Sequence, residues 1–517
     1  MEDRQSFLRG AMVLSVAGAI SKVLGALYRI PLARLIGGEG MGLYQMAYPI
    51  YTTILALGTA GVPIAISVLV SRKETQGYTG DSRKIFRLSL IILAVFGLLL
   101  SSLVIKSAGF ISEFILHEPR AYYPIVAVAP AIFFAGLMSV YRGYFQGYQS
   151  MVPTAVSQVL EQLFRVVAVL VLAVLLFPVG LEYAAAGATF GAVVGGIIGL
   201  VVLNIYWFKS DYTKGVSRHG LVYSGESSFK LAKEMVRLAV PVSIGAVVLP
   251  LVQMLDAVIV PGRLIDIGYT TSQATSLYGE LAGMAAVLIS LPTIFTISIA
   301  TSLVPAISEA LAKNDHNLLN SRLNYGFRAG MIISLPCTAG LFILAYPICS
   351  LLYATPSAGF PLQPLAFSCI VLAAFQLSSA GLQGIGYPQV AMRSLLVTGL
   401  LKVIFNYSLT SVPELNIQGA AIGTVIAFLV GSLLNIIHLK RMTGVRYEVG
   451  RLIKIALVTV IMGAGVLSCY DLLTGAGIGS HLSTLISIMA GVLLYGGLLL
   501  LIKELDGSMI KKIIKGV

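Results

Sequence analysis

Long apolar stretches follow one another along almost the whole chain and limit its fold more than any other feature. A helix that crosses a bilayer needs about 20 mostly apolar residues. Stretches such as 396–405 and 486–502 do not alternate between polar and apolar residues, as the strands of a membrane barrel would. The sequence therefore predicts an all-α polytopic membrane protein with about fourteen transmembrane helices. The expected spans are 10–36, 43–71, 84–107, 121–145, 153–178, 182–208, 236–260, 278–304, 324–350, 362–384, 390–410, 417–439, 452–472 and 483–502.

Composition excludes several other classes of protein. Of the 517 residues, 57% are hydrophobic and 11% are charged, against about 25% charged in an average soluble domain. A soluble enzyme, a disordered chain and a coiled coil are excluded, because each needs a more charged surface. The net charge of +13 lies mainly in short loops between apolar stretches, which is typical of membrane proteins. No nucleic-acid partner is expected.

The distribution of lysine and arginine predicts the orientation in the membrane. With the N-terminus inside and fourteen alternating spans, most of the 35 basic residues fall on the inner side. Such an excess marks the cytoplasmic face. Both termini are therefore expected in the cytoplasm, with the first apolar stretch retained as a transmembrane helix. The outer side keeps Lys106, Arg120 and Arg263.

Similar segments recur in the two halves of the chain. Gln146 and Gln383 each begin a Gln-Gly pair, and the cations Arg165 and Lys402 follow at the same spacing. This pattern predicts two six-helix lobes related by a pseudo-two-fold axis along the membrane normal, as in parallel-repeat transporters. The expected regions are an N-lobe at 1–208, a cytoplasmic linker at 209–235, a C-lobe at 236–440, and two extra helices with a cytoplasmic tail at 441–517.

Six ionisable residues within the predicted spans are candidate substrate-binding residues. A charge at mid-membrane costs about 2.5–3.5 kcal/mol on insertion scales and usually faces a cavity or a partner. The first span contains two cations seven residues apart, which places them on one helix face. The candidates are Lys22, Arg29, Glu161, Arg165, Asp256 and Lys402.

Each candidate also has a structural interpretation. Lys22 can extend to the membrane surface. Glu161 and Arg165 form an i,i+4 pair that neutralises itself. Asp256 can neutralise a cation of the first span or bind a coupling cation, whereas Glu280 is expected to be solvated near the outer surface. The net charge of the candidates is positive, which favours an anionic, phosphorylated substrate.

No catalytic or metal-binding motif was found. The five histidines are scattered, the four cysteines lie within or near apolar stretches, and no HExxH, GxSxG or Walker A sequence occurs. The chain is therefore expected not to be an enzyme and to contain no metal or cofactor. A coupling cation (Na⁺ or H⁺) or the membrane potential is expected to drive its cycle.

Several segments resemble the MurJ-type lipid II flippases, and in particular their stage V sporulation protein B-like branch. This branch belongs to the multidrug/oligosaccharidyl-lipid/polysaccharide (MOP) exporter superfamily. The similar segments are 21–25 (SKVLG), 37–44 (GGEGMGLY), 157–165 (SQVLEQLFR), 291–308 and 312–315.

The resemblance implies a multi-pass protein of the bacterial cytoplasmic membrane that moves an undecaprenyl-pyrophosphate-linked sugar from the inner to the outer leaflet. It implies alternating access, cations that hold the pyrophosphate, and cell-wall synthesis proteins as partners. Lys22 matches a cation position of the family. Other family arginines fall at or near Tyr28, Thr52 and Val287, so Arg165 and Lys402 are interpreted as replacements.

Other functions are compatible with the sequence. A cation-coupled drug or metabolite antiporter of the same superfamily would need an acidic pocket, for which Asp256 is the main candidate. A flippase for another polysaccharide unit would share the cationic cavity. A membrane-embedded transferase would need a cluster of acids or histidines at one membrane face, and a scaffold would not need charges inside its spans.

Overall fold

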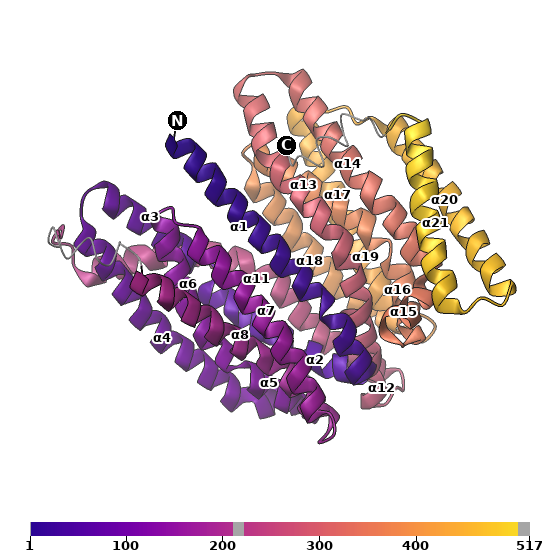
Figure 1. Cartoon of the computed structure of the whole chain (residues 1–517), viewed down its shortest axis with the longest axis horizontal. Helices are drawn as coiled ribbons and strands as arrows, with labels where there is room; N and C mark the ends of the chain where they lie inside the picture. The colour runs from indigo at the N-terminus through magenta and orange to yellow at the C-terminus, as the bar shows by residue number, and fades with distance from the viewer. Residues whose placement is uncertain (1, 210–221, 505–517) are drawn as a thin grey trace. The chain divides into compact units, whose positions relative to one another are not determined.

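The computed structural model describes residues 2–209 and 222–504, in which all regular structure is helical (Figure 1). The helices of the first part are α1 (Glu2–Leu27), α2 (Arg29–Thr59), α3 (Val62–Thr75), α4 (Thr79–Phe110), η1 (Ile111–Ile115), η2 (Pro119–Ala121), α5 (Tyr122–Val128), α6 (Pro130–Gly147), α7 (Val152–Leu176) and α8 (Leu181–Lys209). Those of the second part are α11 (Ser228–Asp266), α12 (Thr271–Tyr278), η3 (Gly279–Ala285), α13 (Ala286–Ala312), α14 (His316–Ile343), α15 (Ala345–Tyr353), η4 (Pro356–Ala358), α16 (Gly359–Leu365), α17 (Ser368–Gly384), α18 (Pro388–Thr410), α19 (Ile417–Thr443), α20 (Val449–Gly475) and α21 (Ser480–Leu501).

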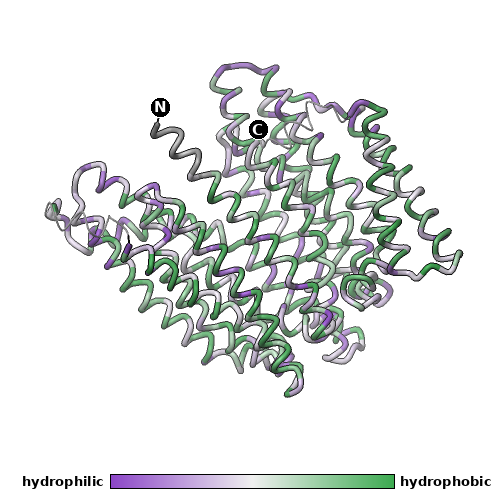
Figure 2. The backbone as a smooth tube through the Cα atoms, viewed as in Figure 1, coloured by the Kyte–Doolittle hydropathy of each residue, from purple (hydrophilic) through white to green (hydrophobic). Residues whose placement is uncertain are grey.

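The prediction of a polytopic all-α membrane protein is confirmed. Within the described ranges, 12 helical segments are long and apolar enough to cross a membrane, and α16 with α17, bent by 43°, raises this to 13. One of the segments, Met12–Thr75, is 64 residues long, which is enough for two crossings. Figure 2 shows hydrophobic residues along the helices and hydrophilic residues gathered in turns such as that between α3 and α4. The orientation of the termini stays a prediction.

The chain divides into two compact units. Unit 1 comprises Met1–Gly262 and Thr270–Gly279, and unit 2 comprises Arg263–Tyr269 and Glu280–Val517. Unit 1 therefore includes α11 up to Gly262 and the whole of α12. The lobe boundaries drawn from the internal repeat and its pseudo-two-fold axis stay predictions.

In unit 1, glycines on one face of α8 bring this helix close to α7. A Cβ atom on Gly191 would lie 2.5 Å from a Val169 methyl, and one on Gly195 would lie 2.7 Å from the carbonyl oxygen of Glu161. Gly187 and Gly199 continue the face at four-residue spacing. Small residues at this spacing allow membrane helices to approach until their backbones touch. This packing fixes the position of the charged part of α7.

The α18–α19 pair of unit 2 repeats this packing at matching positions. Cβ atoms on Gly419, Gly423 and Gly431 would contact the carbonyl oxygen of Leu409, the side chain of Asn406 and the hydroxyl of Thr398. The matching glycines in unit 1, Gly187, Gly191 and Gly199, face Leu172, Val169 and Glu161. The spacing between matching positions is constant along each helix, which supports the internal repeat.

A break in α2 allows this helix to pack closely against α12 within unit 1. Gly37 adopts φ 66° and ψ −171° in the middle of α2, a conformation that glycine adopts easily. Beyond the break, a Cβ atom on Gly42 would lie 2.0 Å from the carbonyl oxygen of Thr275. One on Gly279 would lie 1.9 Å from the carbonyl oxygen of Gly38. The two segments therefore pack backbone to backbone.

We expect Gly42→Ala to separate α2 from α12 and to destabilise the protein by about 1–3 kcal/mol, because the added methyl overlaps a carbonyl group. Thermal unfolding of the purified protein in detergent measures the effect. Gly245→Ala is the matched control, since nothing lies within 4 Å of its Cβ position. Equal melting temperatures for the two variants would contradict the close packing.

Candidate functional site

The candidate site of unit 1 is built around the carboxylate of Glu161. Arg165 on the next turn of α7 donates from Nη2 to Glu161 Oε1 at 2.7 Å, and Arg142 of α6 donates from Nη2 to Oε2 at 2.8 Å. The side chains of Glu161, Arg165 and Arg142 are each between 13% and 20% exposed. Glu161 therefore orients two guanidinium groups at once, and the predicted i,i+4 pair is part of a larger network.

Four tyrosines and a third arginine lie beside this network. The hydroxyls of Tyr28 and Tyr44 are 2.7 Å apart, and the rings of Tyr44 and Tyr48 stack with centroids 5.5 Å apart. Arg29 places its guanidinium carbon 5.8 Å from the centre of the Tyr48 ring. Arg165 lies within interaction range of the hydroxyl of Tyr51. We call these residues, with Arg142 and Glu161, the arginine–tyrosine cluster.

The arginine–tyrosine cluster has excess positive charge and unused hydrogen-bond donors. Three guanidinium groups face one carboxylate among its members. The Nε atoms of Arg29 and Arg165 are buried and have no hydrogen-bond acceptor in the described structure. A buried donor without an acceptor is costly, and an anion that accepts from both would remove this cost.

The predicted site residues divide between the two units. Arg29, Glu161 and Arg165 belong to the arginine–tyrosine cluster, whereas Lys22 on α1 is exposed. Asp256 is buried in unit 1 and acts electrostatically on Tyr278 of α12. Lys402 is half-buried on α18 of unit 2. The role of Arg165 and Lys402 as matching substrate-binding cations of the internal repeat stays a prediction.

Sequence reasoning missed Arg142 and the tyrosines. Arg142 lies near the end of the predicted span 121–145, on the expected inner side of the membrane, where a basic residue is ordinary. The grouping of the tyrosines could have been predicted from the sequence. Tyr44, Tyr48 and Tyr51 follow the i, i+4, i+7 spacing that puts them on one helix face. The contact of Arg142 with Glu161 depends on the packing of α6 and has no such signal.

A second polar cluster in unit 1 surrounds Glu118, which is 1% exposed. Arg120 donates from Nη2 to Glu118 at 2.8 Å and from Nη1 to Glu39 at 2.7 Å. Two residues of α12 complete the cluster: Thr275 donates to Glu118 at 2.8 Å and Ser272 donates to Glu39 at 2.5 Å. Burial acts to raise the pKa of Glu118, but the hydrogen bonds from Arg120 and Thr275 outweigh it and hold the pKa below 4.5.

The expected solvation of Glu280 is wrong. This residue is the second of the π-helix η3 (Gly279–Ala285), belongs to unit 2 and is 5% exposed. Ser357 donates to its Oε1 at 2.7 Å, and its Oε2 has no partner in the described part of the chain. The residue packs against η4, which the hydropathy pattern did not predict.

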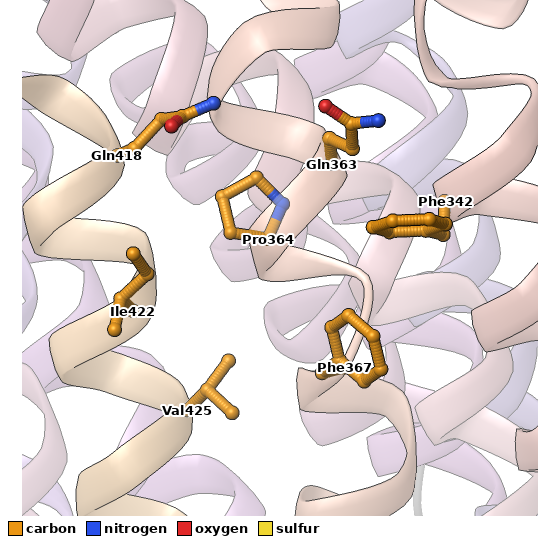
Figure 3. A pocket seen from close by; sticks show the side chains of 7 residues that line it. All are labelled: Phe342, Gln363, Pro364, Phe367, Gln418, Ile422 and Val425. Carbon is orange, nitrogen blue, oxygen red and sulfur yellow. The ribbon is translucent and has the colours of Figure 1, made fainter. Parts of the chain in front are cut away.

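A pocket of about 400 Å³ lies in unit 2 at the bend between α16 and α17 (Figure 3). Phe342 and Phe367 approach within 5.4 Å between ring centres on one side, and Ile422 and Val425 of α19 lie on the other. The polar lining residues are amides, among them Gln418. The pocket therefore fits an apolar group better than an anion. Across residues 2–209 and 222–504, no group of three or more potential ligands could hold a metal ion.

Comparison with known proteins establishes the class. The family described as polysaccharide biosynthesis protein matches residues 7–311, and the MatE family matches residues 279–408. Stage V sporulation protein B of Bacillus subtilis (strain 168) is 33% identical over 435 residues, covering 84% of this chain and 83% of the relative. Lipid II flippase MurJ of the same organism is 29% identical over 481 residues, covering 89% and 87%.

The fold agrees with these relatives. A structure titled lipid II flippase MurJ, inward closed conformation, superimposes with a TM-score of 0.69 at 18% identity and covers 94% of this chain and 98% of that one. The chain is thus a multi-pass membrane protein with the fold of MOP superfamily transporters. It belongs to the polysaccharide biosynthesis protein family, which confirms the resemblance seen in the sequence.

We expect Glu161→Gln to destabilise the protein by about 3–5 kcal/mol, because it leaves buried arginines without their carboxylate. Thermal unfolding in detergent measures the loss. Glu309→Gln is the matched control, since Glu309 forms an exposed i,i+4 pair with Lys313, and it should leave the melting temperature unchanged. A similar small effect of both substitutions would show that Glu161 does not organise the cluster.

The lowered pKa of Glu118 predicts a pH-dependent contribution to stability. A carboxyl whose pKa is lower in the folded state stabilises the fold fully above its unfolded pKa, here 4.5, and this stabilisation disappears as the pH falls through the folded pKa. Wild type should therefore melt above Glu118→Gln at about pH 7, and the difference should shrink at about pH 3. A difference that does not change with pH would contradict this assignment.

Proposed function

We propose that the protein is a flippase that moves an undecaprenyl-pyrophosphate-linked sugar, lipid II or a related cell-wall precursor, from the inner to the outer leaflet by alternating access. The arginine–tyrosine cluster carries this proposal, because it combines excess positive charge with two buried Nε donors that lack acceptors. The relatives named stage V sporulation protein B and lipid II flippase MurJ support it.

The side chains of the cluster suit a pyrophosphate. Arginine binds phosphate oxygens through several N–H groups at once, and a low dielectric strengthens this attraction. In this proposal, Arg29 and Arg165 donate to the phosphates while Glu161 holds Arg165 and Arg142 in place. Lys402, at the position of unit 2 that matches Arg165, contributes a further cation, as does Lys22.

The proposed cycle needs an energy source and a supply of substrate. A coupling cation (Na⁺ or H⁺) or the membrane potential resets the transporter in this proposal, with Asp256 as the candidate cation-binding residue. The partners are the lipid-linked substrate in the bilayer and the cell-wall synthesis proteins that produce and consume it. Dissipating each gradient with a selective ionophore during transport identifies the driving force.

Expression in cells depleted of their own lipid II flippase tests the function. We expect wild type to restore the accessibility of lipid II at the outer face. Arg165→Gln combined with Lys402→Gln should lower it at least tenfold, because a hydrogen bond to a charged group contributes about 1.5–3 kcal/mol. Lys230→Gln combined with Lys313→Gln is the control, since both lysines are exposed and form i,i+4 ion pairs.

The outcomes separate the function from the site. Full activity of the Arg165/Lys402 variant would refute the proposed phosphate contacts while leaving flipping intact. No restoration by well-expressed wild type would refute lipid II as the substrate, and the same assay with other polyprenyl-linked glycans then tests that class.

Cation-coupled antiport of a drug or metabolite is the second candidate. The MatE match over residues 279–408 and the buried Asp256 favour it. Efflux of cationic dyes that depends on a sodium or proton gradient and is lost in Asp256→Asn would support it. The excess of arginine in the cluster favours an anionic substrate instead.

A further inference from the structure

A polar pocket of about 360 Å³ opens in unit 1 at the start of α4, and none of its lining residues belongs to the arginine–tyrosine cluster. Three cations from the first turns of α4 line it, together with apolar residues of the next turn. Tyr223, from the segment that leads into α11, and Ser228, the first residue of α11, form the other side. The full lining is Arg83, Lys84, Arg87, Leu88, Ile91, Tyr223 and Ser228.

Helix stability does not explain the three cations. The N-terminal end of a helix carries a partial positive charge, so cations there are unfavourable and acids are favourable. α4 begins at Thr79 and has one acid in its first turn, Asp81. The cations Arg83, Lys84 and Arg87 lie in the second and third turns, where they gain nothing from the helix dipole.

Asp81 and Glu226 lie at the corner where the α3–α4 turn meets residues 222–227, and both already interact with other groups. Asp81 accepts from Ser224 and lies 3.5 Å from Lys73, and Glu226 accepts from Lys73 at 2.8 Å and from Lys230 at 2.9 Å. The hydrogen bonds from Lys73 and Lys230 lower the pKa of Glu226 to about 2, so it stays ionised. The carboxylates of Asp81 and Glu226 therefore already have partners other than Lys84 and Arg87.

Two of the three cations keep their charge available for a ligand. Lys84 donates to a neutral acceptor, the backbone carbonyl of Glu226, at 2.6 Å. Neither Lys84 nor Arg87 forms an ion pair with a carboxylate of the described residues. The corner thus carries more positive than negative charge, and part of that charge lines a pocket.

The apolar side of the pocket identifies the kind of ligand. Ile91 is 63% exposed on the next turn of α4, and Tyr223 is 53% exposed on the opposite side of the pocket. Phe229, which is 78% exposed, lies outside the pocket lining at the start of α11. Exposed aromatic residues beside cations at the end of a membrane helix mark the headgroup region, where tyrosine and basic residues contact anionic lipids. A soluble phosphate would use the cations but not this apolar surface.

We propose that this pocket binds the phosphate of an anionic glycerophospholipid, with Arg83, Lys84 and Arg87 around the headgroup and Leu88 and Ile91 along the start of an acyl chain. Tyr223 covers the headgroup from the opposite side. Residues 222–227 contribute Tyr223 to the pocket and are held to α3 and α4 by Lys73 and Lys84. A bound lipid therefore also stabilises this contact. The proposal is independent of the transported substrate.

Native mass spectrometry of the purified full-length protein tests the site, with phosphatidylglycerol as the probe and phosphatidylcholine as the zwitterionic reference. We expect selective retention of phosphatidylglycerol by wild type. Arg83→Gln, Lys84→Gln and Arg87→Gln combined should weaken it by about fivefold for each cation removed. The matched control combines Lys440→Gln, Arg441→Gln and Arg446→Gln, three exposed cations of unit 2, and should bind as wild type does.

Ser228→Trp keeps all three cations but fills the pocket, so it distinguishes a built site from general attraction to a basic surface. We expect it to lose phosphatidylglycerol selectivity while its melting temperature stays at the wild-type value. Equal retention by wild type and the triple variant, or unchanged retention by Ser228→Trp, would overturn the proposal. Displacement of the lipid by millimolar glycerol 3-phosphate would also overturn it in favour of a soluble phosphate ligand.

Discussion

The double ion pair of Glu161 with Arg142 and Arg165 is the interaction on which the candidate site depends. Arginines in a membrane-spanning region are costly unless a carboxylate or an anion faces them. One carboxylate between two guanidinium groups lowers this cost without cancelling the positive charge. The remaining charge, together with Arg29, gives unit 1 a cationic cluster of side chains within its helices.

Helix packing explains how this ion pair is kept in place. The glycine face of α8 brings it against the backbone of Glu161 and Arg165, which leaves little freedom to that part of α7. The α18–α19 pair of unit 2 has the same packing but carries Thr398 and Lys402 at the matching positions. The architecture is thus repeated while the charge pattern is not, so the two units have different chemistry on the same scaffold.

The cationic site also accounts for a departure from the MurJ-type pattern. Positions at which the resemblance led us to expect arginine carry Tyr28, Thr52 and Val287. Tyr28 lies within the arginine–tyrosine cluster, whose three arginines come from α2, α6 and α7. Positive charge is therefore gathered within unit 1 by a different set of helices.

The sequence by itself determined the all-α membrane architecture and the approximate spans, because apolar length is a local property of the chain. Short segments such as 157–165 indicated the family through their resemblance to known proteins. The sequence also identified Arg29, Glu161 and Arg165, since charges inside apolar stretches are conspicuous. It could not give the contact of Arg142 with Glu161, the burial of Glu280 or the polar contacts between α12 and α2. These depend on which helices pack together, and the tertiary structure decides that through close backbone contacts between residues distant in the chain.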